Sequence, residues 1–182
     1  MEDRLKGKGG DTQKGYNVTS IAFSPEEDLV ASGGSDGWVR VWNIQTLKLI
    51  KKRKLHRDSV TSLAFSPDGK TLVSGGGGLD ASIQLWKIHD KKKPLHLKGH
   101  RRGVLSVAFS HNGLEVLSGG EDHLVKLWDV RTGEELAIFK GYSKDVCSVA
   151  FTKNMIASVS LDGRIKLYLT ATDEEVARQR NK

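Results

Sequence analysis

Along this chain, short runs of apolar residues alternate with small or polar residues, and one such run occurs four times. The run reads VTSIAFS from Val18, VTSLAFS from Val60, VLSVAFS from Val104 and VCSVAFT from Val146, at steps of 42, 44 and 42 residues. A second pattern follows each copy in phase: DGWVRVW from Asp36, DASIQLW from Asp80, DHLVKLW from Asp122 and DGRIKLY from Asp162. Alternation of this kind predicts β-strands. The chain is therefore predicted to consist of four copies of one strand-rich unit.

The third repeat shows how one unit is built. Val104 to Phe109 is predicted as its first strand, and Asn112-Gly113 tolerates the positive φ that a tight hairpin turn needs. Leu114 to Ser118, Val125 to Leu127 and Leu136 to Phe139 are predicted as the other strands. Four short strands at this spacing form an antiparallel all-β unit, and a period of about 40–45 residues is typical of propeller blades. The predicted fold is an all-β propeller of four-stranded antiparallel blades, in which stacked sheets bury each other's faces.

Two residue pairs in the third repeat, Gly99-His100 and Trp128-Asp129, resemble the signature of the WD-repeat β-propeller family, and the resemblance covers about residues 15 to 179. In that family a His, a second-strand Ser or Thr, the turn Asp and a third-strand Trp form a hydrogen-bonded network that satisfies buried polar groups. The resemblance implies two such networks: His56, Ser74, Asp80 and Trp86, and then His100, Ser118, Asp122 and Trp128.

The first and last repeats depart from this pattern. Lys14 stands at the His position of the first repeat. In the fourth repeat, Tyr142 replaces the His and Tyr168 replaces the Trp. We therefore expect the outer blades to be less tightly tied than the inner two.

The repeats divide the chain into a polar tail at residues 1–14, expected to be disordered, and blades at 15–55, 56–98, 99–140 and 141–182. The last repeat is expected to supply its own fourth strand near Val176 and Ala177. The resembled family commonly closes a ring of seven blades, so four blades imply an incomplete ring with apolar end faces. Three solutions stay open: two chains close an eight-bladed ring, the chain is a fragment or short isoform of a longer propeller, or another protein caps the ends.

Composition and charge narrow the function classes. Hydrophobic residues make up 37% of the 182 residues, which suits a globular protein, and the net charge is +7. The excess of positive charge lies in three short segments: Lys51 to Lys54, Lys91 to Lys93 and Arg101-Arg102. Such segments permit an anionic partner such as RNA, although charge runs are also typical of solvated surfaces. Without a long apolar run or a signal-peptide pattern, we expect no membrane association and an intracellular location, cytoplasmic or nuclear.

Catalytic and metal-binding chemistry is weakly represented. A His, Ser and Asp recur at the same positions of two repeats, whereas a catalytic group is normally placed once, so we expect no catalytic residue and no enzyme. His96 and His100 have an H-x₃-H spacing without a Cys pair nearby, so no metal site is expected. The glycine-rich segments lack the ending of a phosphate loop, so no cofactor is expected. The single Cys147 excludes an internal disulfide, and its apolar surroundings predict a small buried side chain.

In the resembled family, two sets of loops open on one rim that commonly binds peptides or proteins. By position these loops carry eight candidate partner-binding residues: Arg57, Arg101, Arg102 and Lys144 in one set, and Trp38, Glu121, His123 and Arg164 in or beside the other. An exposed Trp near arginines is typical of interface hot spots. Packing of Trp38 between blades is an equally open alternative.

A further segment, Trp128-Asp129-Val130-Arg131, matches a Trp-Asp-x-Arg pattern that marks substrate receptors of cullin-type ubiquitin ligases in some WD-repeat proteins. If the chain is such a receptor, Asp129 and Arg131 would contact the adaptor subunit of the ligase. The alternative is that the two residues only form a local turn. Three functions follow from the sequence. The first is a non-enzymatic scaffold that binds proteins or peptides on the rim and supports assembly of a multiprotein complex. The alternatives are a ribonucleoprotein component with basic loops on phosphates, and the ubiquitin-ligase receptor.

Overall fold

The structure of the chain is a computed structural model, and it describes residues 16–169. The predicted tail at residues 1–14, Lys14 and the predicted fourth strand near Val176 and Ala177 lie outside the described residues. The predicted division into repeats can be compared with the structure within these limits.

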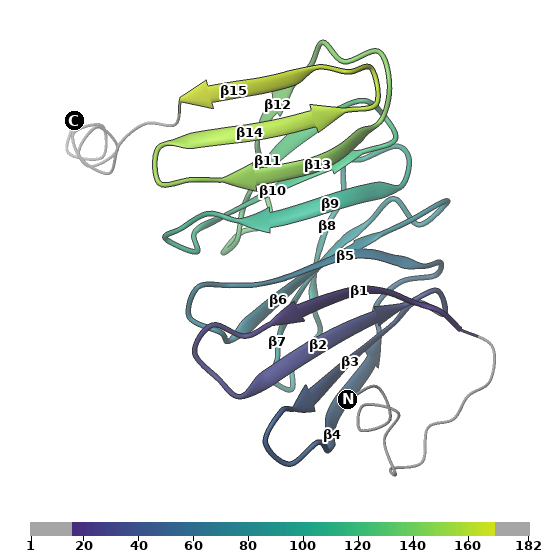
Figure 1. Cartoon of the computed structure of the whole chain (residues 1–182), viewed down its shortest axis with the longest axis vertical. Helices are drawn as coiled ribbons and strands as arrows, with labels where there is room; N and C mark the ends of the chain where they lie inside the picture. Colours follow the sequence, from purple (N-terminus) through teal and green to yellow (C-terminus); the bar gives the residue numbers. More distant parts are fainter. Residues whose placement is uncertain (1–15, 170–182) are drawn as a thin grey trace.

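The described residues form fifteen β-strands, grouped in four antiparallel sheets that we call blades 1 to 4 (Figure 1). Blade 1 consists of β1 (Val18–Phe23), β2 (Leu29–Gly34), β3 (Trp38–Asn43) and β4 (Leu49–Lys54), and blade 2 of β5 (Val60–Phe65), β6 (Thr71–Gly76), β7 (Ile83–Lys87) and β8 (Leu95–Leu97). Blade 3 consists of β9 (Val104–Phe109), β10 (Glu115–Gly120), β11 (Val125–Asp129) and β12 (Glu135–Phe139), and blade 4 of β13 (Val146–Phe151), β14 (Met155–Ser160) and β15 (Ile165–Leu169).

The blades stack side by side, and their first strands β1, β5, β9 and β13 contact one another in sequence order. Within each blade the strands follow one another in sequence order as neighbours. Blade 1 and blade 4 lie at opposite ends of the stack in Figure 1. The predicted fold class is confirmed: the described residues are all-β and form propeller-type blades, and residues 16–169 do not close into a ring.

The hydrophobic core lies between the blades, in three separate clusters. Between blades 1 and 2, Val39 and Val41 pack with Leu72 and Trp86. The next two clusters repeat this arrangement between blades 2 and 3, around Trp128, and between blades 3 and 4, around Ile156. Because side chains alternate between the faces of a strand, the inner blades bury apolar side chains on both of their faces.

One turn position has the same backbone conformation in all four blades. The residue after the turn Asp has a positive φ: 76° at Gly37, 49° at Ala81, 65° at His123 and 82° at Gly163. Glycine adopts this conformation without steric cost, whereas other residues are strained in it. The turn geometry is therefore set by the blade and not by the residue that occupies it.

The prediction that Cys147 is buried is wrong, because its side chain is exposed. Cys147 lies on β13, where its thiol approaches the Val159 carbonyl oxygen at 3.5 Å. Thr61, at the same position of blade 2, is shielded because blade 3 lies beside it and accepts its hydrogen bond at Val104. Blade 4 has no such neighbour among the described residues, so an apolar sequence pattern did not translate into burial.

Candidate interaction rim

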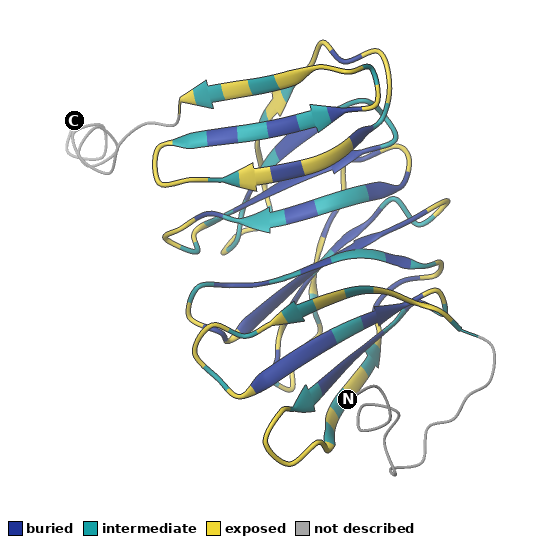
Figure 2. Cartoon of the chain, viewed as in Figure 1, coloured by how far each residue is buried: buried dark blue, intermediate teal, exposed yellow. Residues whose placement is uncertain are grey.

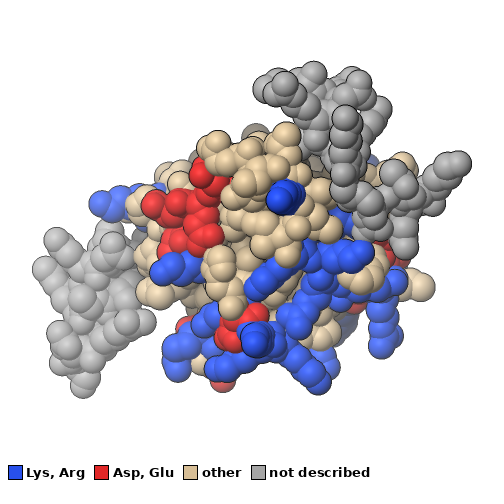
Figure 3. All heavy atoms as spheres, turned by 90° about the horizontal axis from the view of Figure 1, so that it is seen from below, with Lys and Arg blue, Asp and Glu red and all other residues tan. Residues whose placement is uncertain are grey.

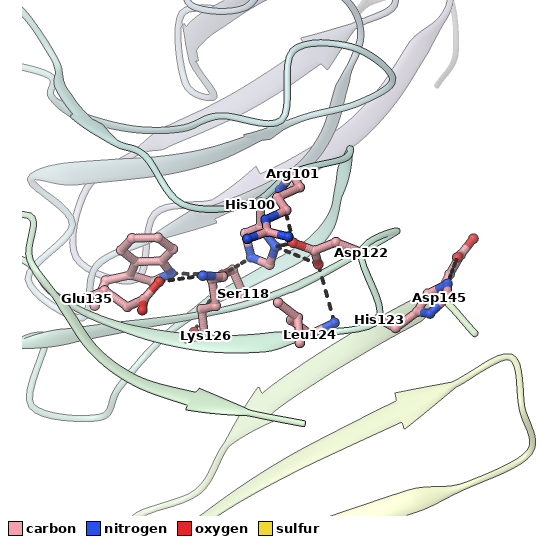
Figure 4. Close-up of polar contacts among 10 residues, drawn as sticks. His100, Arg101, Ser118, Asp122, His123, Leu124, Lys126, Glu135 and Asp145 are labelled. Atoms are coloured by element: carbon pink, nitrogen blue, oxygen red, sulfur yellow. Dashed lines mark hydrogen bonds and ion pairs between the residues drawn. The ribbon is translucent and has the colours of Figure 1, made fainter. Parts of the chain in front are cut away.

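His100 stands at the centre of a polar network in blade 3, shown in Figure 4. Its Nε2 lies 2.7 Å from the Ser118 hydroxyl, and its Nδ1 lies 2.9 Å from the Asp122 carboxylate. The indole of Trp128 donates to the same Ser118 hydroxyl at 2.8 Å. Asp122 in turn accepts from the backbone N–H of Arg101 at 3.0 Å. The network thus links the second and third strands to the loop that enters blade 3.

Blade 2 has a related network with a different membership. His56 Nε2 lies 2.8 Å from the Ser74 hydroxyl, and Nδ1 lies 3.2 Å from both Asp80 and the Ser82 hydroxyl. Trp86 lies in the apolar core between blades 1 and 2. Within residues 16–169, no hydrogen bond joins its indole to Ser74. The hydroxyl of Ser82 therefore provides a polar contact that the sequence-based network did not include.

Burial and hydrogen bonding fix the charge state of this network. Burial lowers the pKa of His56 below its ordinary value of 6.5, and the hydrogen bond and charge of Asp80 only partly offset this. Burial disfavours the Asp80 carboxylate too, but hydrogen bonds from Ser82, the Arg57 amide and His56 outweigh it and lower the pKa of Asp80. At neutral pH the pair is a neutral imidazole beside a carboxylate.

The end blades are tied by other side chains. In blade 4 the phenol of Tyr142, which replaces the His, lies 2.7 Å from the Ser158 hydroxyl and donates to the Ser158 carbonyl at 3.0 Å. In blade 1, Arg40 forms an ion pair with the turn residue Asp36 at 2.8 Å. Neither contact was foreseen from the sequence, although Arg40 and Asp36 lie four residues apart.

A repeated contact orders one row of rim residues. The turn carboxylate accepts from the backbone N–H of Arg57 in blade 2, of Arg101 in blade 3 and of Ser143 in blade 4. These three residues therefore occupy the same place in successive blades. The side chains of Arg57 and Arg101 are exposed, as are those of the neighbouring Arg102 and Lys144. We call Arg57, Arg101, Arg102 and Lys144 the basic row.

The second set of candidate residues is less open. Glu121 and His123 are half-buried, and His123 Nε2 lies 3.5 Å from Asp145 of the next blade, as Figure 4 shows. Arg164 is exposed and donates to the Gly141 carbonyl at 3.2 Å. Trp38 is half-buried on the face of blade 1 that points away from blade 2, with Lys52 Nζ 5.6 Å from its ring centroid. Trp38 therefore does not pack between two described blades.

A cleft of about 730 Å³ opens beside the start of the basic row. It is formed by the segment that joins β4 to β5, the β6–β7 turn and the end of β8, and its lining includes Lys54, Arg57, Leu79, His96 and Lys98. Burial, with a smaller effect of the Lys98 charge, lowers the pKa of His96. Leu79 is fully exposed at the tip of the turn. The sequence signal for this cleft was the β6–β7 turn, which is two residues longer than its counterparts.

Two remaining sequence features have clear positions. Lys51 donates to the Ile88 carbonyl, and Arg53 donates to the Lys92 carbonyl at 3.1 Å, so the first two basic segments lie side by side. Asp129 accepts from the backbone N–H of Arg131 at 2.8 Å and of Thr132 at 2.7 Å. This segment therefore forms a local turn, from which the Arg131 side chain is exposed.

Comparison with known proteins assigns the family. A family model described as the fourth β-propeller of WDR90 matches residues 17–178. The chain belongs to the WD-repeat β-propeller family. This membership confirms the resemblance inferred from the repeats, and such propellers generally act as sites of protein interaction.

Individual relatives match over short stretches. Rat guanine nucleotide-exchange factor SEC12 is 41% identical over 55 residues, which are 30% of this chain and 13% of that protein. Human apoptotic protease-activating factor 1 is 38% identical over 74 residues, which are 35% of this chain and 6% of that protein. This chain therefore spans a small part of the length of the relatives it matches.

Solved structures share the arrangement of blades. The computationally designed protein Ika4 has a TM-score of 0.77 and 30% identity, over 90% of this chain and 95% of that one. The designed protein Ika8 has a TM-score of 0.74 and 32% identity, over 84% of this chain and 46% of that one. The same stack of blades therefore occurs both as nearly a whole chain and as about half of a longer one.

Two kinds of feature are absent from the described residues. No helix within residues 16–169 is long and apolar enough to cross a membrane. In the same range, no group of three or more His, Cys, Asp or Glu side chains is arranged to hold a metal ion.

Proposed function

We propose that this chain is a non-enzymatic scaffold that binds an acidic segment of a partner protein along the basic row. The main support for this proposal is that Arg57 and Arg101 occupy the same rim position in blades 2 and 3. Their backbones are held by Asp80 and Asp122, while their side chains are exposed. A row of cations on a fixed backbone attracts and orients an acidic partner at little entropic cost.

The cleft beside the row supports the same chemistry. Lys54 and Lys98 add positive charge to its walls, and Leu79 offers an apolar contact. The acid of the cleft, Asp80, is already engaged by His56, Ser82 and the Arg57 amide. A cleft of this volume accommodates side chains of a bound peptide. The partner segment is therefore expected to combine acidic residues with an apolar one.

The triad-like networks support the non-enzymatic part of the proposal. Ser74 and Ser118 are 0% exposed, and each hydroxyl is within hydrogen-bonding distance of its His. A nucleophile needs space for a substrate carbonyl next to it. Since neither hydroxyl can be reached by a substrate, these groups serve the fold.

The test uses a fluorescein-labelled peptide of alternating Glu and Leu, followed by anisotropy at low salt. The double variant Arg57→Glu/Arg101→Glu should weaken binding at least about tenfold, because like charges then face the peptide. The matched control, Lys92→Glu/Lys93→Glu, changes the same net charge on the exposed loop between β7 and β8. Equal weakening by the control, or no binding by the unmodified chain, would overturn the rim proposal.

One observation favours an RNA-binding alternative: the contacts of Lys51 with Ile88 and of Arg53 with Lys92 bring two basic segments together. Phosphate contacts make affinity fall steeply with salt. Binding of a 20-nucleotide uridine oligomer, weakened by Lys92→Glu/Lys93→Glu and by added salt but not by the rim variant, would support this alternative over the peptide.

A further inference from the structure

The two ends of the stack expose apolar sheet faces, visible as exposed segments on β1, β13 and β15 in Figure 2. At the blade 1 end, Ile21 is 58% and Phe23 is 65% exposed. At the blade 4 end, Ile165 is 68% and Leu167 is 61% exposed. Apolar faces of this kind mark interaction surfaces. The contacts between neighbouring blades inside the chain show which kind of surface packs on such a face.

Each internal contact joins two different kinds of face. The face that a blade turns toward the preceding blade, which we call its leading face, carries Leu63, Phe65, Leu72 and Trp86 in blade 2. The opposite or trailing face carries small and aliphatic side chains, and in blade 1 these are Ala22, Leu29, Ala31, Val39 and Val41. A trailing face on a leading face is the packing found at all three internal contacts.

The strand register identifies the two free faces. On blade 1, Phe23 pairs with Val30, and Val30 with Trp42, as Phe65, Leu72 and Trp86 do in blade 2. The leading face of blade 1 therefore has no blade packed against it among residues 16–169. On blade 4, Ala150 pairs with Ala157, and Ala157 with Leu167, as Ala22, Ala31 and Val41 do in blade 1. The trailing face of blade 4 likewise has no blade against it in the part of the chain that the structure describes.

Hydrogen bonds between the first strands of neighbouring blades also join the trailing face of one blade to the leading face of the next. Thr19 donates to the Val60 carbonyl, and Thr61 to the Val104 carbonyl. The Val107 N–H donates to Ser62 at 3.1 Å. The Val149 N–H likewise donates to Ser106 at 3.1 Å.

Blade 4 carries Cys147 and Ser148 at the positions of Thr61 and Ser62, and both are exposed. Blade 1 carries Val18 and Ile21 at the positions of Val104 and Val107. The two ends of one chain therefore offer both halves of a blade contact: a thiol and a hydroxyl on blade 4, and a carbonyl and an N–H on blade 1.

We propose that the trailing face of blade 4 docks on the leading face of blade 1 in a second copy of this chain, so that two copies close a ring of eight blades. Blades 1 and 4 lie at opposite ends of the stack (Figure 1), so these two faces do not meet within residues 16–169. A two-fold axis makes both contacts at once and leaves no free face, and eight blades lie within the range of known propellers.

The surface at the blade 1 end fits this partner. Figure 3 looks onto that end and shows a patch of uncharged residues with Asp and Glu on its left, Lys and Arg below it and to its right, and one blue group within it. The trailing face of blade 4 presents the uncharged side chains of Met155, Ala157, Val159, Ile165 and Leu167 in register. The leading face of blade 1 also carries two cations: Arg40 is ion-paired with Asp36 at 2.8 Å, and Lys52 Nζ lies 5.6 Å from the Trp38 ring centroid. Docking therefore buries apolar surface around charges that already have contacts within their own blade.

The first test is the mass of the purified 182-residue chain by light scattering. The expected mass is twice the 20.0 kDa of one chain. Phe23→Lys, on the leading face, and Leu167→Lys, on the trailing face, should each give a monomer, because each closing contact uses one face of each kind. Leu79→Lys is the matched control, since Leu79 is fully exposed on a rim turn away from both faces, and it should leave the mass unchanged.

Mixing the two variants tests which faces meet. A Phe23→Lys chain keeps an intact trailing face and a Leu167→Lys chain keeps an intact leading face, so a mixture should regain a two-chain mass through one contact. A dimer formed by two leading faces, or by two trailing faces, would not be restored in this way. No recovery in the mixture would therefore overturn the docking rule.

Cys147 gives a readout that does not depend on mass. In the ring it lies against the second copy, so its reaction with a maleimide should be at least about tenfold slower than in Phe23→Lys. A monomer with equally reactive Cys147 would overturn the proposal and would leave the faces to further blades of a longer chain. Masses that keep rising with concentration would also overturn it, because they indicate open-ended stacking and no closed ring.

Discussion

At the scale of single residues, His56 couples the fold to pH. Burial lowers its pKa below 6.5 despite the adjacent Asp80, so the unfolded chain binds a proton more readily than the folded one. The stability from His56 is therefore complete above pH 6.5 and is lost as pH falls below that value. His96, whose pKa burial also lowers, acts in the same direction. The lowered pKa of Asp80 adds stability that is complete above its ordinary pKa of 3.8 and is lost only as the pH falls below that value.

We therefore expect the free energy of unfolding to fall between pH 7.5 and pH 5.5. Urea titrations at the two pH values measure it. The His56→Gln variant should be less stable at pH 7.5 and should lose less stability on acidification. His111→Gln, which replaces an exposed His, should keep the full pH dependence. A pH dependence unaltered in His56→Gln would contradict the assignment.

The residue-scale geometry was partly accessible from the sequence. His56, Ser74 and Asp80 could be placed together because their positions match the hydrogen-bonded network of the WD-repeat family that the sequence resembles. The contact of Tyr142 with Ser158 could not, because a phenol hydroxyl extends farther from the backbone than an imidazole nitrogen and its reach depends on packing. Trp86 is the opposite case: it stands at the position that the family network predicts, but it lies in the core without the expected hydrogen bond to Ser74.

At the scale of elements, the turn that follows the repeated Asp of each blade provides a matched pair of glycines. Gly37 and Gly163 have φ values of 76° and 82°. A Cβ at Gly37 would lie 2.3 Å from the His56 carbonyl oxygen, whereas a Cβ at Gly163 would have no neighbour within 4 Å. The two positions therefore separate backbone strain from steric conflict.

Gly163→Ala should cost about 1–2 kcal/mol of unfolding free energy, because alanine is strained at positive φ. Gly37→Ala should cost at least about 2 kcal/mol more, since the link to blade 2 must also shift. Ala81→Gly, at the same turn position of blade 2, should stabilise the chain by roughly 1 kcal/mol. Urea unfolding measures all three, and equal costs at the two glycines would contradict the steric argument.

The strands themselves were well predicted, because alternation of apolar and polar residues reports directly which positions face a neighbouring sheet. The fourth strand expected at Leu136 to Phe139 is observed as Glu135–Phe139. Burial was not equally predictable. Cys147 and Thr61 occupy the same position of their strands, and only the presence of a following blade decides which of them is shielded.

At the scale of the whole molecule, the number of repeats predicted an open stack of blades, but what covers its ends depends on surfaces that meet only in an assembly. Among the described residues, blades 2 and 3 have a packed neighbour on each side, whereas blades 1 and 4 have one each. In repeat proteins, stability is approximately a sum of repeat terms and nearest-neighbour contacts. An open stack should therefore be most stable at its centre.

Hydrogen exchange of the backbone amides tests this expectation. In both Phe23→Lys and Leu167→Lys, exchange should be slowest in β6 and β10 and at least about tenfold faster in β14, whose blade has a single neighbour. In the unmodified chain β14 should approach the protection of β10, because a second copy covers blade 4. Using variants at opposite ends separates the loss of docking from local damage, since Phe23 lies three blades away from β14. If β14 exchanges equally fast in all three proteins, blade 4 is uncovered in each of them. Equal protection of β6, β10 and β14 in both variants would contradict the nearest-neighbour account.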